Sequence, residues 1–232
     1  MSMSNPLLNI QGLPPFSQIK PEHIQPAVEK LIQDCHDTIE QVLKQPHFTW
    51  ENFILPLTET NDRLNRAWSP VSHLNSVKNS TELREAYQAC LPLLSEYSTW
   101  VGQHKGLYNA YLALKNSAEF TDYSIAQKKA IQNSLRDFEL SGIGLSEDKQ
   151  QRYGEIVARL SELNSQFSNN VLDATMGWEK LIENEAELAG LPESALQAAQ
   201  QSAESKGLKG YRFTLEIPSY LPVMTYCENR AL

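Results

Sequence analysis

A long amphipathic stretch between Ser146 and Gly177 sets the demands that any fold of this chain has to meet. Ser146 is a good helix cap, and acidic residues follow it in the first turn, where the helix dipole favours negative charge. Apolar side chains then recur at near-heptad spacing, at Tyr153, Ile156, Leu160, Leu163, Phe167, Val171 and Ala174. The pattern predicts a helix about 45 Å long at 1.5 Å per residue. Such a helix needs other helices along most of its length.

Four further segments show the three-to-four spacing of one-faced helices, and they cover roughly residues 21–44, 49–68, 79–101 and 124–141. Proline and glycine mark their limits. Ser69 and Pro70 are predicted to end the second helix, and Pro56 and Pro92 to bend the second and third. Gly142 is the residue type expected where a helix ends through a left-handed position.

The pattern changes after Gly177, where two short segments alternate partly between apolar and polar residues. In "FTLEI", Phe213, Leu215 and Ile217 share one face, which predicts a half-buried strand. Two strands are expected within about residues 178–220, around a helical piece from about 192 to 206, and a last helix is expected from Val223. A lone two-stranded ribbon is marginal in water, so either its sheet partners or its cover are expected beyond residue 232.

The simplest organisation is a single mostly helical unit over residues 1–232. No repeat, low-complexity tract or Ser/Gly linker divides the chain. The fold class predicted from the pattern is therefore mainly α, with several helices and a small β element near the C-terminal end.

Composition excludes two classes of partner. Twenty basic residues against twenty-eight acidic ones give a net charge of −8, and no basic run exceeds the pair Lys128-Lys129, so no nucleic acid is expected as a partner. No membrane is expected either, because no run reaches the eighteen apolar residues of a bilayer span. Three widely spaced cysteines are typical of free thiols in a reducing compartment, so the protein is expected to be cytoplasmic.

The motifs that usually carry catalysis are missing from the sequence. No two of the five histidines are spaced three or four residues apart, so no helix offers a zinc-binding pair. There is no Cys-x-x-Cys, no Gly-x-Gly-x-x-Gly and no Gly-x-Ser-x-Gly elbow. No catalytic residue, metal ligand or cofactor is assigned in this chain.

The polar segment "SPVSHLNSVKNS", residues 69–80, is the best local candidate for a functional loop. His73 and Asn75 are the substrate-contact candidates, since a histidine among serines and asparagines can orient a carbonyl or carboxylate group. The structural alternative is stronger: both residues can satisfy the helix ends between which they lie.

For two other groups of residues, a structural role is the preferred interpretation. Tyr97, Trp100, Tyr108 and Tyr111 follow helical spacing, so they are expected in the core, and a peptide-contacting wall is the second interpretation. The acidic residues at positions 183, 185 and 187 are expected to form a solvated face.

Longer stretches carry a specific resemblance. They are "SPVSHLNSVKNS", "LPLLSEYSTWVGQHKGLY", "AQKKAIQNSLRDFELSGIGL", "QQRYGEIVARLSELNSQFSNNVLDATMGW", "EAELAGLPESAL" and "IPSYLPVMTYC". In order and without large gaps from Asn5 to Leu232, the chain resembles the N-terminal portion of bacterial members of the thimet oligopeptidase and neurolysin family of zinc metallopeptidases.

The resemblance implies a fold and a function. The family is largely helical, with two lobes that face each other across a channel admitting short unfolded peptides, so these helices are expected to form the N-terminal lobe and much of one channel wall. The family's zinc site, a His-Glu-x-x-His helix with a downstream Glu, lies beyond the position corresponding to Leu232. No catalytic or metal residue is therefore carried over.

The chain is accordingly expected to be a truncated lobe, inactive alone, whose full-length parent binds zinc. In that parent a metal-bound water, assisted by the motif Glu, attacks the peptide carbonyl. The expected partners are short peptides, as substrates of the parent, and the remaining C-terminal part of the same protein. The alternative function is a non-catalytic helical module that binds peptides or proteins.

Overall fold

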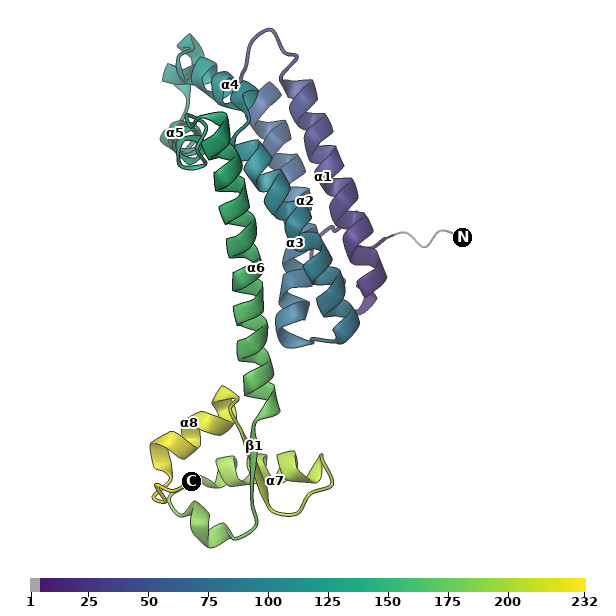
Figure 1. Cartoon of the computed structure of the whole chain (residues 1–232), viewed down its shortest axis with the longest axis vertical. Coiled ribbons are helices and arrows are strands. Elements are labelled where there is room, and N and C mark those ends of the chain that lie inside the picture. Colours follow the sequence, from purple (N-terminus) through teal and green to yellow (C-terminus); the bar gives the residue numbers. More distant parts are fainter. Residues whose placement is uncertain (1–4) are drawn as a thin grey trace. The chain divides into compact units, whose positions relative to one another are not determined.

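The computed structural model describes residues 5–232, and these form eight α-helices and two strands (Figure 1). The mainly α fold with a small β element near the C-terminal end is therefore confirmed. The chain divides into two compact units, the first ending at Asn164 and the second running from Ser165 to Leu232. The single mostly helical unit expected over residues 1–232 stays a prediction.

The first unit is built on three long helices, α1 (Pro21–Val42), α2 (Leu55–Val77) and α3 (Thr81–Gly102). Helix α1 packs against both α2 and α3, whereas α2 and α3 make far fewer contacts with each other. A π-helical turn, Trp50–Ile54, leads into α2. The unit also contains α4 (Lys105–Lys115), α5 (Ile125–Leu140), short 3₁₀ turns at Phe16–Gln18 and Ala118–Asp122, and the first part of α6 (Glu147–Gly177).

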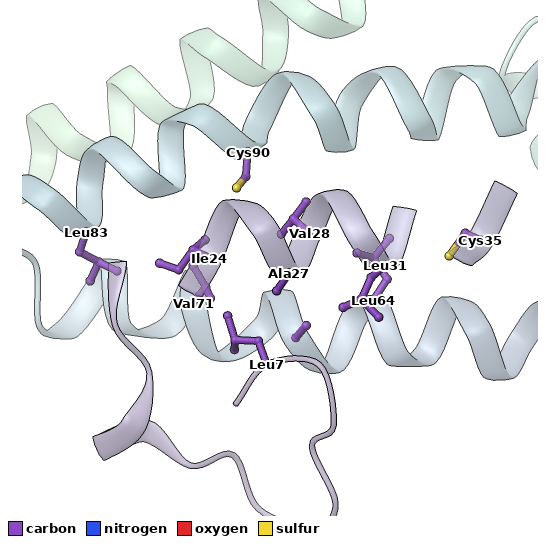
Figure 2. Close-up of a cluster of buried hydrophobic side chains, with 11 residues drawn as sticks. Leu7, Ile24, Ala27, Val28, Leu31, Cys35, Leu64, Val71, Leu83 and Cys90 are labelled. Atoms are coloured by element: carbon purple, nitrogen blue, oxygen red, sulfur yellow. The ribbon is translucent and has the colours of Figure 1, made fainter. Parts of the chain in front are cut away.

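The apolar stripe of α1 enters the core as its spacing predicts. Figure 2 shows Ile24, Val28, Leu31 and Cys35 of α1 among side chains of the neighbouring helices. All four are at most 2% exposed. Burying an aliphatic side chain of this size contributes roughly 1.5–3 kcal/mol of stability. This stripe is what holds α2 and α3 to α1.

A second cluster fills the space around α4 and α5. Phe53, from the π-helical turn, is fully buried, and its ring centroid lies 5.0 Å from those of both Phe48 and Tyr111. Tyr111 in turn lies 5.6 Å from Phe138 of α5. Gly142 then ends α5 with φ +83°, as predicted, and Ile143 N–H donates to the carbonyl of Phe138 at 3.2 Å.

One predicted boundary is wrong, and one helix was not predicted. Helix α2 does not end at Ser69 and Pro70 but continues to Val77. Pro70 is buried beside Val71, which is fully buried, so core packing outweighs the backbone hydrogen bond that proline cannot donate. The sequence pattern also did not predict a separate helix at α4, which begins after His104.

Helix α6 covers the predicted range, and much of its apolar stripe is solvent-exposed. Its exposed stripe residues are between 42% and 71% accessible: Ile156, Leu160, Leu163, Phe167 and Val171. A helix with such a stripe is half of a packing interface. The apolar stripe of α6, which the sequence pattern predicts to pack against other helices, is therefore left largely uncovered.

The second unit contains the predicted ribbon. Strands β1 (Glu179–Ile182) and β2 (Tyr211–Thr214) are antiparallel, with Glu179 opposite Thr214 and Ile182 opposite Tyr211. Helix α7 (Glu193–Glu204) packs on β2, after a 3₁₀ turn at Glu185–Leu188. The unit's core combines Ile182, Leu188, Leu191, Ala199 and Phe213.

The end of this unit corrects two expectations. Strand β2 stops at Thr214, so Leu215 and Ile217 do not continue its buried face: Phe213 is buried, whereas Leu215 and Ile217 are exposed. The last helix, α8 (Ile217–Tyr226), begins at Ile217 rather than at Val223. Pro218 fits the first turn of that helix. The ribbon also obtains cover within the chain, from α7.

One helix start in the first unit depends on a titratable group. The Nδ1 atom of His104 accepts a hydrogen bond from the backbone N–H of Leu107 at 3.1 Å, which caps α4. The His104 ring lies 4.7 Å from that of Trp100. Burial lowers the pKa of the His104 imidazole, its own backbone hydrogen bond opposes this, and nearby His36 adds to the lowering. A proton on Nδ1 removes the acceptor and therefore the cap.

We predict a pH-dependent loss of stability from this cap. Between the lowered pKa and the ordinary value of 6.5, the unfolded chain binds more protons than the folded chain, so stability falls as the pH drops through 6.5. His104→Asn keeps a capping side chain and removes the titration, so its urea midpoint should fall less between pH 7.5 and 5.5 than that of the wild type. His47→Asn, at an exposed histidine, is the control and should behave as wild type. Equal losses in wild type and His104→Asn would contradict the assignment.

Candidate functional site

The first unit contains a cavity of about 660 Å³ between α2 and α3. Its floor is formed by Ile39 of α1, Leu107 of α4 and Phe138 of α5. The cavity follows from the packing just described, since α2 and α3 both lie against α1 but touch each other little. A concave, mainly apolar pocket of this size is typical of a site for a small molecule or a peptide segment.

The walls of the cavity combine rings with short polar side chains. Trp68 of α2 faces the cavity, as do Tyr97 of α3 and Tyr111 of α4. The polar part of the lining comes mostly from α2, which contributes Thr58, Asn61, Asp62 and Asn65. Helix α3 contributes Ser98. Asp62 also forms an ion pair with Arg66 one turn later, with 3.0 Å between Oδ2 and Nε. Lys, Arg and His are absent from this lining.

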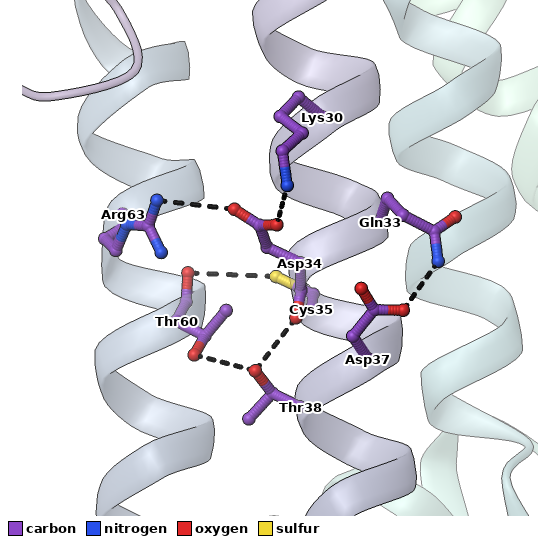
Figure 3. Close-up of polar contacts among 8 residues, drawn as sticks. All are labelled: Lys30, Gln33, Asp34, Cys35, Asp37, Thr38, Thr60 and Arg63. Atoms are coloured by element: carbon purple, nitrogen blue, oxygen red, sulfur yellow. Dashed lines mark hydrogen bonds and ion pairs between the residues drawn. The ribbon is translucent and has the colours of Figure 1, made fainter.

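Hydrogen bonds between α1 and α2 fix the position of the α2 wall (Figure 3). Thr38 and Thr60 are joined through their hydroxyl groups at 3.2 Å, and the Cys35 thiol donates to the carbonyl of Thr60 at 3.7 Å. Asp34 accepts from Lys30, and its other oxygen lies 3.3 Å from Arg63 of α2. These contacts fix which side of α2 faces α1, and therefore which side faces the cavity.

Neither Cys35 nor Tyr97 is suited to proton transfer. Burial raises the pKa of the Cys35 thiol, and burial together with the hydrogen bond to Cys35 raises the pKa of Tyr97 far above its ordinary value. Both groups therefore stay protonated near neutral pH. His36, the sequence neighbour of Cys35, lies instead against Trp100, with 4.2 Å between ring centroids. No thiol–imidazole pair forms here.

His73 and Asn75 lie in the last turns of α2 and not in a loop. Asn75 is 9% exposed, and its Oδ1 and backbone carbonyl accept from the Asn79 amide at 3.0 and 2.9 Å. Asn79 in turn accepts from Arg84 Nε at 3.2 Å, so Asn75 holds the junction between α2 and α3. This supports the structural alternative for Asn75.

His73 has different surroundings from Asn75. It is exposed, and its ring centroid lies 5.8 Å from that of Phe16. The two residues share no site, and neither lines the cavity. Substrate contact by either residue stays a prediction.

The other candidate sets divide between core and surface. Tyr97 and Tyr111 line the cavity, while Tyr108 packs on Phe138 at 5.9 Å between ring centroids. The acidic residues at 183, 185 and 187 are all exposed, as expected, and Glu185 accepts a hydrogen bond from the Tyr211 hydroxyl at 2.6 Å.

The polar side chains of α2 were missed by the sequence analysis. The available signal was that Asn61 and Asn65 are four residues apart, beside the apolar positions Leu57, Leu64 and Trp68. Four-residue spacing places both amides on one side of the helix. The sequence alone could not show that this side faces a cavity.

The zinc implied by the resemblance has no ligand set here. Within residues 5–232, no three His, Cys, Asp or Glu side chains lie close enough together to hold a metal ion. Across the same residues, no helix has both the length and the apolar character that crossing a bilayer requires.

Comparisons with known proteins place this chain among peptidases of one family. The family model for the neurolysin/thimet oligopeptidase N-terminal domain matches residues 28–150. Oligopeptidase A of Haemophilus influenzae is 97% identical over 100% of the chain, and oligopeptidase A of Escherichia coli is 65% identical over 99%. The probable cytosolic oligopeptidase A of Arabidopsis thaliana is 37% identical over 99% of the chain.

The chain covers 34% of the length of each of these three relatives, about a third. The family model covers more than half of the chain, and it falls on the helices that enclose the cavity. The chain therefore belongs to the neurolysin/thimet oligopeptidase family, and residues 28–150 correspond to the N-terminal domain of that family.

Proposed function

We propose that this chain forms part of the channel wall of a cytoplasmic zinc oligopeptidase that hydrolyses short peptides. The observation that carries the proposal is the 97% identity to an oligopeptidase A over the whole chain. The name of the plant relative, a probable cytosolic oligopeptidase A, supports the cytoplasm as its location. The cavity beside α2, with its aromatic and amide lining, suits contact with peptides.

On this proposal the catalytic metal is supplied by the part of the relatives that this chain does not cover. The chain matches a third of their length, and its described residues bring no metal ligands together. Its own role is to bind and exclude: an apolar wall holds peptide side chains, and a fixed helical frame keeps folded proteins out.

The proposed partner of the chain is the remaining part of the same oligopeptidase. In the second unit, α8 exposes Ile217, Leu221 and Met224 at 66%, 55% and 65%. Their spacing of four and three residues places them on one side of the helix. Exposed apolar stripes of this kind mark surfaces that pack against another element. Within its own unit, α8 leaves this stripe uncovered.

A second candidate function is a non-catalytic module that binds peptides by itself. The cavity favours it, because the walls and floor are complete within the first unit. The two functions differ in what happens to the peptide after binding, so hydrolysis in the presence of the remaining part separates them.

Complementation tests the proposed function. We predict that the chain, mixed with the separately produced remaining two thirds of the Haemophilus influenzae relative, restores hydrolysis of short peptides and loses its binding of a hydrophobic dye. Leu221→Glu with Met224→Glu should weaken the pairing by at least tenfold, because two charges would be buried in an apolar contact. Gln201→Glu, at an exposed position of α7, is the control. A chain that binds no dye and ignores the remaining part in a pull-down would contradict the proposal.

Variants of the two sequence candidates separate structure from substrate contact. In the full-length relative, His73→Ala should change turnover only modestly, because the side chain is exposed and is not part of the cavity lining. Asn75→Ala should instead lower stability by about 1–3 kcal/mol, since the Asn79 amide loses a buried acceptor. Peptide hydrolysis and thermal unfolding measure the two effects. Loss of turnover in His73→Ala at an unchanged melting temperature would establish substrate contact.

A further inference from the structure

Asn61 and Asn65 form a pair of amides on the cavity side of α2. Both line the cavity and both are solvent-exposed. Within residues 5–232, neither side chain is engaged in a hydrogen bond, in contrast to Asn52, Asn75 and Asn79 nearby. The fold does not use these two amides, although the frame of α2 holds them in place.

A primary amide matches the backbone of a peptide. Its carbonyl oxygen accepts from a backbone N–H, and its NH₂ group donates to a backbone C=O. In an extended peptide the N–H and C=O of one residue point to the same side, and the next residue with that orientation is two positions along. One asparagine can therefore bind one residue of a peptide, and a second asparagine can bind the residue after next.

The spacing of the two amides agrees with this arrangement. Four residues of α-helix rise about 6.0 Å at 1.5 Å per residue. Two residues of an extended chain span about 6.6–6.8 Å at 3.3–3.4 Å per residue. The difference is under about 1 Å, which the side-chain torsions of asparagine can absorb. A peptide running along α2 would meet Asn61 and Asn65 in register.

The rest of the lining decides which peptides fit. Side chains of an extended peptide alternate between two faces, so one side chain can enter the apolar part of the cavity, at Trp68 and Tyr111. The lining carries one carboxylate, Asp62, and no basic side chain. Arg66 shares this carboxylate from outside the lining. An acidic side chain would be repelled by Asp62, whereas a basic one could replace Arg66 as its partner.

We propose that the cavity between α2 and α3 binds a short, extended, neutral or basic peptide, held through its backbone by Asn61 and Asn65 and anchored by one apolar side chain. No bond is made or broken there. The inference deepens the proposed function, because it assigns to this chain its own contact with the peptides that the whole protein would hydrolyse.

Direct binding to the 232-residue chain tests the proposal. The probe is a fluorescein-labelled hexapeptide, Lys-Ala-Phe-Ala-Lys-Ala, followed by fluorescence anisotropy. Asn61→Leu with Asn65→Leu keeps the side-chain size and removes both amides. Its affinity should fall at least tenfold, since each lost pair of hydrogen bonds contributes on the order of 1 kcal/mol or more. Glu59→Leu, at an exposed α2 position outside the lining, should bind as wild type.

Chemical changes to the peptide test the same contact from the other side. Methyl groups on alternate backbone nitrogens should weaken binding to the wild type by about tenfold and should have little further effect on the double variant. This measurement also decides the question if the double variant fails to fold. Replacing both lysines of the probe by glutamate should weaken binding as well.

The contradicting outcomes are distinct. Equal or tighter binding by the double leucine variant would show a purely apolar cavity and overturn the amide contact. An unmodified probe that fails to bind at millimolar concentration would overturn the site. If the probe binds at low protein concentration but is lost once the chain self-associates, a second copy of the chain, and not a peptide, would be the occupant of the cavity. None of these needs hydrolysis, so failure here leaves the complementation result independent.

Discussion

The packing of α1 between α2 and α3 is the constraint from which the rest of the first unit follows. Its stripe is almost inaccessible to water, with Ile24 and Leu31 at 0%. Packed helices lie about 8–10 Å apart, so two helices that both pack on a third leave a space on their other side unless they also close on each other. Here α2 and α3 do not, and the cavity occupies that space. The cavity is therefore a consequence of the core and needs no separate stabilising device.

Polar contacts then decide which residues face the cavity. Thr60 and Arg63 of α2 are held by Thr38 and Asp34 of α1 (Figure 3). Successive residues on a helix are about 100° apart, so fixing Thr60 against α1 turns Asn61 toward the neighbouring side. An apolar contact alone would allow α2 to rotate by a fraction of a turn at little cost. The hydrogen bonds give α2 one orientation, and Asn61 and Asn65 line the cavity because of it.

The sequence predicted the elements that depend on local pattern. The stripes of α1 and α6, the glycine stop at Gly142 and the two short strands are all present, because spacing and capping are properties of neighbouring residues. It failed where distant packing overrode the local signal. Pro70 reads as a helix end, yet its buried position keeps α2 intact, and Leu215 alternates with Phe213 although the strand has already ended. His104 was considered only as a possible metal ligand, and its role as the cap of α4 follows from geometry.

Under the proposed function, the cavity lining would accept peptides of many sequences and still require them to be unfolded. Exposed asparagine amides are hydrated when the cavity is empty, so binding is favourable only if the incoming group reproduces the hydrogen bonds of the displaced water. A peptide backbone does this whatever its side chains are. In a folded protein those backbone groups are already paired with each other, and releasing them costs the hydrogen bonds of a helix or sheet. Backbone contacts at Asn61 and Asn65 would thus select for free N–H and C=O groups, while Asp62 and the aromatic wall add a milder preference for side-chain charge and size.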